Sequence, residues 1–427
     1  MVAGPATTRR VRVPHPPPGH GGAVRRSRIA VLLAAGLLAG CSSAPAGATG
    51  RQLPHVDPID PTDFHHGAAD PSAAADNLVS VSTVAKHLDV PWGLSFLPDG
   101  NALVTERATQ LIKRVTPKGQ VTTVARIVEA VSDNEGGLLG IAVSPSYRTD
   151  HTVYIYYTTR DDNRVARLRL DGRSQPRPIV TGIPKSGIHD GGRLMFGPDG
   201  YLYASTGEAS HTDASQDLHN LGGKILRMTT DGKPPPGNPF PHSLVWSYGH
   251  RNPEGMAWAA DGTMYESEIG QAVWDELNII RPGANYGWPR IEGIGNDPKY
   301  VDPIVAWHPE VGVSSGVAVV GNTAVVTCLR GQRIYLVPLG KPPTAVGRAS
   351  PSPTGTPDPT ASVRWRPEAG VAGRPREALF ERYGRLRTAL AAPDGSIWMT
   401  TSNRDGRRPG GPEPDDDRIL RLTLRNQ

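Results

Sequence analysis

The chain has 427 residues and a formal net charge of +5, with 46 Lys and Arg against 41 Asp and Glu. Much of the basic excess lies in an arginine-rich N-terminal stretch, and no basic stripe with interleaved aromatic residues follows it, which argues against nucleic-acid binding. Aromatic residues make up only 6%, whereas there are 49 glycines and 42 prolines, a composition that favours short strands and turns over long helices.

The first 40 residues have the organisation of a secretory signal. Arginines precede an apolar run at residues 29–38, which is too short for a stable transmembrane helix. The run ends in Leu38-Ala-Gly-Cys41, which resembles a bacterial lipobox, in which the cysteine is lipidated and becomes the mature N-terminus. We therefore expect a signal peptide at residues 1–40 and an exported lipoprotein, anchored to the cell membrane through Cys41 and facing the extracytoplasmic side. An uncleaved signal anchor is the alternative.

Residues 41–78 are rich in Ala, Ser, Pro, Asp and His and show no periodicity, so we expect a disordered tether. Apart from Cys41, the chain contains one cysteine, Cys328, within the apolar stretch 324–328. Two cysteines of this kind do not form a disulfide framework. We expect Cys328 to be a small buried thiol.

From residue 79 onward, a hairpin pattern recurs: an apolar strand, a tight turn that is often Pro-Asp-Gly, and a second apolar strand. Six copies are present, at residues 92–106, 138–157, 192–206, 248–268, 315–328 and 388–400. Radial repetition of this kind is typical of propellers, because each small sheet must stack on its neighbours to bury both faces. The sequence therefore predicts an all-β fold, a six-bladed β-propeller spanning residues 79–427.

The two ends of the propeller are expected to meet. The strand pattern at residues 418–424 is available to close the ring with an N-terminal partner at residues 79–84. Between the fifth and sixth copies, residues from about 341 to about 374 are rich in Pro, Thr, Ser and Gly, which predicts a disordered insertion.

Polar side chains gather at the strand ends opposite the Asp-Gly turns, so the sequence predicts one polar mouth over the centre of the ring. Its members are Asn134, Glu135, His189, Asp190, Arg251, Asn252, Arg385 and Arg387 before the first strands, and Arg107, Glu208, residues 268–271, Arg330, Asn403 and Arg404 after the second strands. Charged loop residues are often simply solvated, but the same one-sided placement in six repeats favours a site.

This mouth is expected to be cationic. Arg251, Arg330, Arg385 and Arg387 would lie near one another without a matching set of carboxylates, which suggests an anionic ligand bearing carboxylates or phosphates. His189 is the natural general base, since histidine titrates near neutral pH. His250 is its rival, although its place beside Arg251 favours a packing role.

Oxygen ligands for a cation are concentrated in the segment after the fourth hairpin. Residues 268–271 and 274–276, followed by residues 285–288, offer carboxylates and turn carbonyls. A set made of oxygen donors suits Ca²⁺ better than Zn²⁺.

Together these motifs resemble the glucose/sorbosone dehydrogenase family, whose members use pyrroloquinoline quinone (PQQ) and Ca²⁺. Nine short stretches carry the resemblance. They are Thr105-Glu-Arg-Ala-Thr109, Glu135-Gly-Gly-Leu-Leu-Gly140, His189 with Gly192-Arg-Leu194, Gly249-His-Arg-Asn-Pro253, Ser267-Glu-Ile-Gly270, Asp275-Glu-Leu-Asn278, Asn285-Tyr-Gly-Trp-Pro289, Arg385-Leu-Arg387 and Thr401-Ser-Asn403. They occur in family order from residue 79 to the C-terminus, and the family fold is a six-bladed propeller.

The resemblance also implies a role for each matching residue. His189 would take the proton of the sugar C1 hydroxyl while hydride passes to the quinone, so the protein would oxidise aldoses and pass electrons to an unidentified acceptor. Arg251 and Asn252 would line the cofactor, with Arg251 also acting in catalysis. Arg330, Arg385 and Arg387 would bind the quinone carboxylates. The backbone carbonyls of Gly270 and Gln271 would bind Ca²⁺. A structural calcium ion would be held by Asp275, Glu276 and Tyr286.

The chain departs from glucose-oxidising members at four of these positions. Ile188 stands where they carry Asp before the histidine, and Glu135 replaces a Gln that contacts cofactor and substrate. Gln271 replaces Pro at one calcium carbonyl, which matters little because the ligand is backbone, and Arg330 replaces Lys. Glu135 places negative charge beside an anionic quinone, which favours a diverged aldose dehydrogenase of broad specificity.

Two other functions fit the same pattern. A non-catalytic propeller lipoprotein could bind an anionic ligand or a protein at the mouth, in which case PQQ and Ca²⁺ would not bind. A lactonase-like hydrolase using Ca²⁺ with acidic and amide ligands would act without any quinone. The sequence does not distinguish which sugar or which acceptor is used.

Overall fold

The computed structural model describes residues 79–172, 175–341 and 362–425. The chain divides into two units, residues 1–66 and 67–427, and all described residues belong to the second. The expected signal peptide, the tether and Cys41 therefore lie outside the described residues. Within the described ranges, no helix has both the length and the apolar character needed to cross a membrane.

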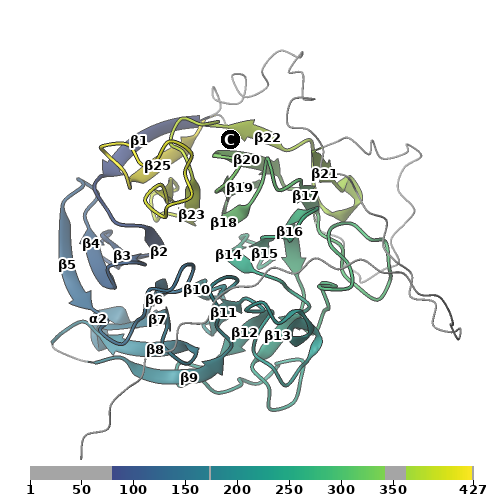
Figure 1. Ribbon diagram of the computed structural model, residues 1–427, viewed down its shortest axis with the longest axis horizontal. Helices are drawn as coiled ribbons and strands as arrows, with labels where there is room; N and C mark the ends of the chain where they lie inside the picture. Colours follow the sequence, from purple (N-terminus) through teal and green to yellow (C-terminus); the bar gives the residue numbers. More distant parts are fainter. Residues whose placement is uncertain (1–78, 173–174, 342–361, 426–427) are drawn as a thin grey trace, which may run out of the picture. The chain divides into compact units, whose positions relative to one another are not determined.

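The described strands form six antiparallel sheets arranged in a ring, as Figure 1 shows, which confirms the predicted six-bladed propeller. Blade 1 consists of β2 (Pro91–Phe96), β3 (Ala102–Glu106), β4 (Leu111–Val115) and β5 (Val121–Arg126). Blade 2 consists of β6 (Leu138–Val143), β7 (Thr152–Thr158), β8 (Asn163–Arg169) and β9 (Arg177–Ile183). Blade 3 consists of β10 (Leu194–Phe196), β11 (Leu202–Thr206), β12 (Lys224–Met228) and β13 (Val245–Tyr248).

The other three blades include strands that return from elsewhere in the chain. Blade 4 consists of β14 (Pro253–Trp258), β15 (Met264–Glu268), β16 (Asp275–Ile280), β17 (Val305–Trp307) and an added strand, β21 (Val363–Trp365). Blade 5 consists of β18 (Ser314–Val320), β19 (Thr323–Cys328), β20 (Arg333–Pro338) and β22 (Arg376–Ala378). Blade 6 consists of β23 (Leu386–Ala391), β24 (Ile397–Thr401), β25 (Ile419–Leu424) and β1 (Val79–Ala85).

An Asp-Gly pair forms the tight turn in the first hairpin of several blades. In the turn between β10 and β11, Gly200 has φ of 78°, a left-handed conformation that costs glycine little, and Asp199 accepts a hydrogen bond from the amide of Tyr201 at 3.2 Å. The turn between β2 and β3 repeats both features at Asp99 and Gly100. These turns place the ends of the two strands together at the opposite edge, where the polar residues are.

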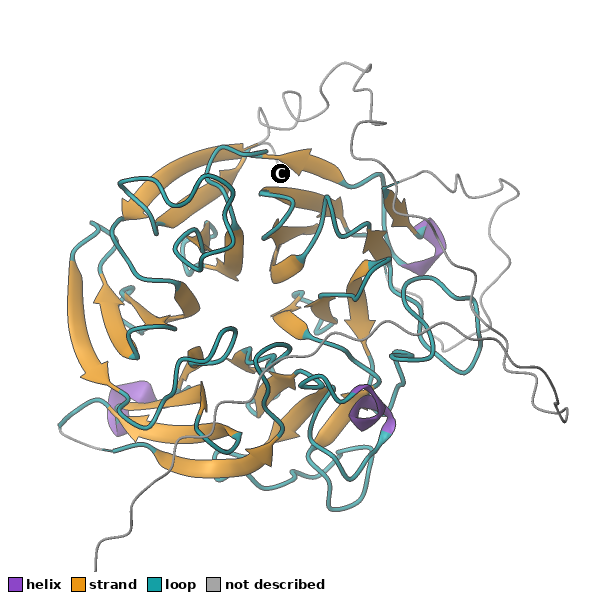
Figure 2. Ribbon diagram, in the orientation of Figure 1, coloured by secondary structure: helices purple, strands orange, loops and turns teal. Residues whose placement is uncertain are grey.

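The ring closes as the sequence predicts. β1 pairs with β25 in antiparallel register from Val79 opposite Leu424 onward, so the N-terminal strand completes the last blade. Helices are few among the described residues: the short α2 (Tyr147–Asp150) and two single 3₁₀ turns, η1 (Thr212–Gln216) and η2 (Pro367–Ala369) (Figure 2). Cys328 is fully buried in β19, as expected.

The predicted insertion is shorter than the sequence suggests. Residues 342–361 lie outside the described residues, but residues 362–374 do not form the disordered segment expected there. β21 pairs with β17, with Val305 opposite Trp365, and η2 follows it. Composition alone does not reveal this strand, because its pairing partner β17 lies more than fifty residues earlier in the chain.

Candidate functional site

The predicted mouth residues do lie at the strand ends opposite the Asp-Gly turns. His189 belongs to the loop that leads into β10, and Glu208 follows β11 in the same blade. In the neighbouring blade, Arg251 and Asn252 lead into β14. Hydrogen bonds join these two loops, because the Glu208 amide donates to the Arg251 carbonyl oxygen at 2.9 Å.

His189 and Glu208 form the acid–base pair of the mouth. The Nδ1 atom of His189 lies 2.5 Å from Oε1 of Glu208, whose side chain is 1% exposed, whereas the imidazole is 12% exposed. The Nε2 atom of His189 makes no hydrogen bond within the part of the chain that the structure describes. A carboxylate at Nδ1 holds the proton there, which leaves the Nε2 lone pair free to accept a proton.

The backbone at His189 is held in an unusual conformation. Its φ is 62°, in the left-handed region that a residue with a side chain enters only when its surroundings require it. The amide of His189 donates to Oε2 of Glu135 at 2.8 Å, and its carbonyl oxygen accepts from the amide of Ala209 at 3.1 Å. Gly207 packs directly against that carbonyl group, where any Cβ would clash. Both peptide groups of His189 are therefore fixed, which orients the ring.

Glu135 is not an isolated negative charge. Nη1 of Arg407 donates to its Oε1 at 2.7 Å, and Nη2 of Arg407 donates to Asn134 Oδ1 at 2.8 Å. Burial alone would raise the pKa of Glu135, but Arg407 and the His189 amide outweigh it and hold the pKa below its usual value. Arg407 lies in the loop after β24 and was not singled out from the sequence. The charge that seemed unfavourable beside an anionic quinone is thus neutralised within the protein.

The prediction that the mouth arginines lack carboxylate partners is wrong. Arg385 donates to Oδ2 of Asp405 from both Nε and Nη2, at 3.1 and 3.0 Å. Arg387 lies 3.9 Å from the same oxygen and donates to Oε2 of Glu254 at 2.7 Å. Asp405 follows β24 and Glu254 lies within β14, so neither stands beside these arginines in the sequence. The first hairpin of blade 6 brings Asp405 to the arginines, whereas the closed ring brings Glu254 to Arg387.

Glu254 is the centre of a buried polar network. Besides Arg387, its carboxylate accepts from Ser315 Oγ at 2.6 Å, and its carbonyl oxygen accepts from Arg193 Nε at 2.7 Å. The Arg193 guanidinium also lies over the ring of Trp92, 4.4 Å from the centroid. These residues come from blades 1, 3, 4, 5 and 6. The network therefore joins the innermost strands beneath the mouth.

Arg107 is a buried guanidinium of the mouth. It is 6% exposed, its Nε atom is buried without a partner, and no side-chain hydrogen bond joins it to the described residues. Burial and the neighbouring Arg387 guanidinium together lower the pKa of Arg107 to about 10, against the opposing effect of the Asp405 carboxylate. Buried donors that remain unsatisfied are costly, so Arg107 is poised to bind an anion.

The other two predicted arginines lie in different surroundings. Nη1 of Arg251 donates to the carbonyl oxygens of Ile269 and Gly270 at 3.0 and 2.6 Å, while its buried Nε has no partner. Arg330 follows β19, and its side chain is exposed without a hydrogen bond or ion pair to the described residues. Asn252 is buried, and its Oδ1 accepts from the Gly191 amide at 3.0 Å, so it braces the His189 loop.

The loop after β15 contains Gly270 and Gln271, whose carbonyls are the predicted calcium ligands. The amides of Gln271 and Ala272 donate to Oε1 of Glu292 at 2.8 and 3.0 Å. In a trans peptide the carbonyl group points away from the amide, so the carbonyls of Gly270 and Gln271 both point away from Glu292. The Gly270 carbonyl meets Arg251 on that side. Backbone carbonyl oxygens are a donor type that Ca²⁺ uses, and in this structure the Gly270 oxygen accepts from Arg251.

Asp275, Glu276 and Tyr286 do not form one set of side-chain ligands. Asp275 accepts from the amides of Gly270, at 2.9 Å, and Val313, and burial raises its pKa to about 7. Glu276 is the next residue of β16, so it points to the other face of the sheet. The hydroxyl of Tyr286 donates to the Ile279 carbonyl oxygen at 2.6 Å. The predicted structural calcium ion is therefore not supported by a shared cluster of these three side chains.

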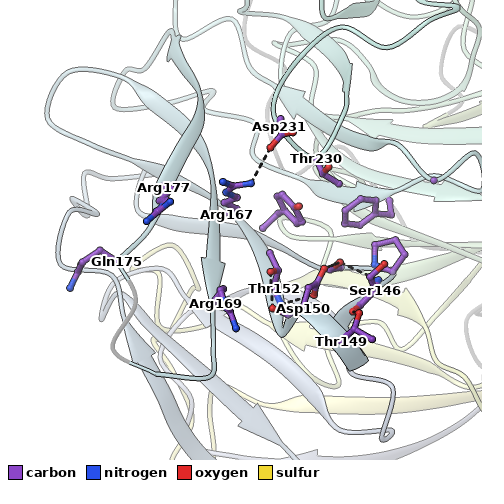
Figure 3. Close-up of a pocket in the computed structure, with 15 residues that line it drawn as sticks. Ser146, Thr149, Asp150, Thr152, Arg167, Arg169, Gln175, Arg177, Thr230 and Asp231 are labelled. Atoms are coloured by element: carbon purple, nitrogen blue, oxygen red, sulfur yellow. Dashed lines mark hydrogen bonds and ion pairs between the residues drawn. The ribbon is translucent and has the colours of Figure 1, made fainter.

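A cavity of about 1090 Å³ lies on the other face of blades 2 and 3, lined by α2, β8, β9 and the turn after β12. Arg167 points toward Asp231 there and lies 3.0 Å from it, while Ser144 donates to Asp150 at 2.7 Å (Figure 3). Its polar groups are largely paired with one another, and it contains no histidine. We therefore assign the chemistry to the mouth.

The chain matches known proteins along most of the described residues. Residues 88–348 match the family model for glucose/sorbosone dehydrogenase. The chain is 33% identical over 282 residues to quinoprotein glucose dehydrogenase B of Acinetobacter calcoaceticus, covering 57% of this chain and 58% of that protein. It is 34% identical over 236 residues to aldose sugar dehydrogenase YliI of Escherichia coli, covering 51% of this chain and 63% of that protein. The chain thus spans less than two thirds of these curated relatives.

A solved structure of similar size also matches. The PQQ-bound form of aldose sugar dehydrogenase from Streptomyces coelicolor superposes with a TM-score of 0.72 at 42% identity. The match covers 81% of this chain and 98% of that one.

Proposed function

We propose, from the premise that this chain belongs to the glucose/sorbosone dehydrogenase family, that it is a PQQ-dependent dehydrogenase that oxidises aldose sugars at C1. The relatives that support this proposal are named a quinoprotein glucose dehydrogenase and an aldose sugar dehydrogenase, and a similar structure contains PQQ.

One observation carries the proposal: His189 presents a free Nε2 at the mouth while Glu208 binds its Nδ1. Such a base can take the proton of a sugar hydroxyl, and the buried carboxylate stabilises the imidazolium that results. Glu135 and Ala209 hold the peptide groups on either side, so the ring does not need to reorient when the sugar binds.

The residues present fit an anionic quinone and a calcium ion. When bound, PQQ would accept the hydride from C1, and Ca²⁺ would act on it as a Lewis acid. The buried Nε atoms of Arg107 and Arg251 lack partners, and Arg385 and Arg387 carry further donors, so all four are suited to the quinone carboxylates. Arg330 would contribute from the rim, Asn252 by bracing the His189 loop, and the carbonyls of Gly270 and Gln271 would hold Ca²⁺.

The experiment is reconstitution of the purified, metal-stripped protein with PQQ and Ca²⁺, followed by dye reduction with a panel of aldoses. We expect reduction that needs both additions and the sugar, and a loss of that reduction in His189→Gln. The spectrum of bound PQQ should survive the substitution. Activity that persists in His189→Gln would remove this residue from the role of base.

The same experiment distinguishes the other two functions. If PQQ and Ca²⁺ cause no spectral change and no thermal shift, the result favours a non-catalytic propeller that binds another anionic ligand or a protein at the mouth. Hydrolysis of lactones with Ca²⁺ alone would identify a lactonase-like enzyme.

Our proposal also places the protein outside the cytoplasm as a lipoprotein. Support comes from the sequence alone, in which the apolar run is followed by Leu38-Ala-Gly-Cys41. Metabolic labelling with a radioactive fatty acid should mark the protein in the membrane fraction. Cys41→Ser should abolish the label, and an equal label in that variant would contradict lipidation at this residue.

A further inference from the structure

A second group of acidic residues lies behind the mouth, inside blade 4. Glu266 and Glu268 alternate along β15, and Glu276 and Asn278 alternate along β16. The register places Glu266 opposite Asn278 and Glu268 opposite Glu276. Directly opposed residues of an antiparallel pair lie on the same face, so these four side chains form a square on one side of the sheet.

This square faces the gap between blades 3 and 4. Met264 and Ile280 continue the same face of the sheet and pack with Tyr203 and Ile225 of blade 3. His250, from the loop before β14, covers the square and stacks on Tyr286 at 4.7 Å between ring centroids. The carboxylates of Glu266, Glu268 and Glu276, the amide of Asn278 and the imidazole of His250 are all buried.

The hydrogen bonds of this group leave one carboxylate oxygen unused. Asn278 Nδ2 donates to Oε2 of both Glu266 and Glu276 at 3.1 Å. Glu268 accepts from the Arg251 amide and lies 2.8 Å from His250 Nδ1. Glu276 Oε1 accepts from the Gly293 amide at 2.7 Å. Oε1 of Glu266 is buried with no partner, and so is Oδ1 of Asn278.

The buried carboxylates of this group lack a matching set of cationic side chains. Among the described residues, no Lys or Arg side chain forms an ion pair with Glu266, Glu268 or Glu276, so His250 is the one basic partner. Three carboxylates in a dry interblade gap repel one another unless protons or a positive ion neutralise them.

The geometry suits a metal ion. One ligand atom from each of His250, Glu266 and Glu268 lies within 4.8 Å of the other two, a spacing that a single ion can bridge. Ser247 Oγ lies 2.9 Å from His250 Nε2 and can take its N–H, which leaves the Nδ1 lone pair for the metal.

We propose that His250, Glu266 and Glu268 bind a structural divalent transition-metal ion, best fitted by Zn²⁺, between blades 3 and 4. An imidazole nitrogen in the set disfavours Ca²⁺, and all three ligands are buried, as in a structural rather than a catalytic metal site. This site differs from the calcium carbonyls of the mouth, which belong to the loop after β15, and it does not depend on the proposed sugar oxidation.

The test measures bound metal in the full chain without PQQ. Chelator-treated protein is offered Zn²⁺, Mn²⁺ and Ca²⁺ at equal concentration, dialysed, and analysed by mass spectrometry of the elements. We expect about one Zn²⁺ per chain in the wild type and a loss of affinity of at least about 10-fold in Glu266→Gln. Glu377→Gln, on β22 and paired with Arg333, is the matched control and should keep its zinc.

Thermal unfolding shows whether the variant is folded. Glu266→Gln removes one of three mutually repelling charges, so without metal it should melt no lower than the metal-free wild type. Zn²⁺ should raise the melting temperature of the wild type and not that of Glu266→Gln. The proposal is overturned if the wild type binds no zinc, binds calcium alone, or if Glu266→Gln keeps the zinc.

Discussion

Two histidine–glutamate pairs occupy equivalent places in neighbouring blades. His189 and Glu208 flank the first hairpin of blade 3, and His250 and Glu268 flank the first hairpin of blade 4. In both, imidazole Nδ1 meets a buried carboxylate, at 2.5 Å in blade 3 and 2.8 Å in blade 4. The second nitrogen differs, since Nε2 of His189 is free at the mouth, whereas Nε2 of His250 contacts Ser247 in a fully buried site.

The comparison shows that the pair alone does not define a base. An imidazole can transfer a proton to or from a substrate only when one nitrogen can reach it. The pair in blade 3 meets this condition, and the pair in blade 4 instead joins a polar cluster that holds two blades together. Whether Nε2 can reach a substrate therefore distinguishes a catalytic histidine from a structural one. Five substitutions test the comparison and the site around it.

The largest effect should come from His189→Gln. Glutamine can still donate to Glu208 but cannot accept the sugar proton, so kcat should fall by about 10²- to 10⁴-fold. Steady-state dye reduction with PQQ, Ca²⁺ and an aldose measures this change. His189→Gln should lower the free energy of unfolding by less than His250→Gln, the matching substitution in blade 4. A larger loss of stability in His189→Gln than in His250→Gln would contradict the comparison.

His250→Gln is that matching substitution. Removing one partner of a buried pair leaves Glu268 unpaired and should lower the unfolding free energy by about 3–5 kcal/mol. Denaturant titration of both variants, followed by tryptophan fluorescence, gives the two values side by side. If His250→Gln unfolds like the wild type, the blade 4 pair does not stabilise the fold.

Arg107→Met examines the anion site of the mouth. Hydrogen bonds to charged groups contribute about 1.5–3 kcal/mol, so the dissociation constant of PQQ should rise by about 10- to 150-fold. The residue is otherwise unpaired, so its replacement by an apolar side chain of similar length should not destabilise the fold. Isothermal titration with PQQ measures the effect, and unchanged affinity would show that Arg107 lies out of reach of the cofactor.

Glu208→Gln tests the partner of the base. The amide keeps a contact with Nδ1 but lacks the charge that stabilises the imidazolium, and loss of such a supporting contact typically costs about 10- to 100-fold in activity. We expect the fall in kcat with little change in KM. Glu208→Asp, which keeps the charge, should recover part of the activity, and a failure to do so would indicate a purely structural role.

The smallest effect should follow Arg407→Ala. The Arg407 side chain is 40% exposed, and ion pairs at exposed positions contribute about 0.2–1 kcal/mol. The substitution frees Glu135 without removing its bond to the His189 amide, so kcat/KM should fall by less than about 5-fold. A loss above about 100-fold would mean that Arg407 contacts cofactor or substrate directly, since a surface pair cannot account for it.

The repeat pattern was sufficient to predict the fold. Six hairpins, four of them with Asp-Gly turns, predicted a ring, and the strand at residues 418–424 identified its closure with β1. The same turns placed His189, Glu208 and Arg107 at one end of the strands. These features are local, since each depends on a few neighbouring residues whose spacing is visible in the sequence.

The partners of the site residues could not be predicted in this way. Glu254 reaches Arg387 from another blade, and Arg407 reaches Glu135 across 272 positions of the chain. Such contacts depend on the closed ring. The square of blade 4 depends instead on the register of β15 and β16, which sets Glu268 opposite Glu276. The order of residues along the chain does not display either relationship.

The most direct measurement is a single turnover of the PQQ-loaded protein. Wild type and His189→Gln, each saturated with PQQ and Ca²⁺, are mixed with excess aldose in the absence of oxygen and any acceptor, and the quinone absorbance is followed. We predict rapid reduction of bound PQQ in the wild type, and in His189→Gln an unchanged initial spectrum with no reduction on the same timescale. Equal rates of reduction in the two proteins would contradict the claim that the free Nε2 of His189 is the base.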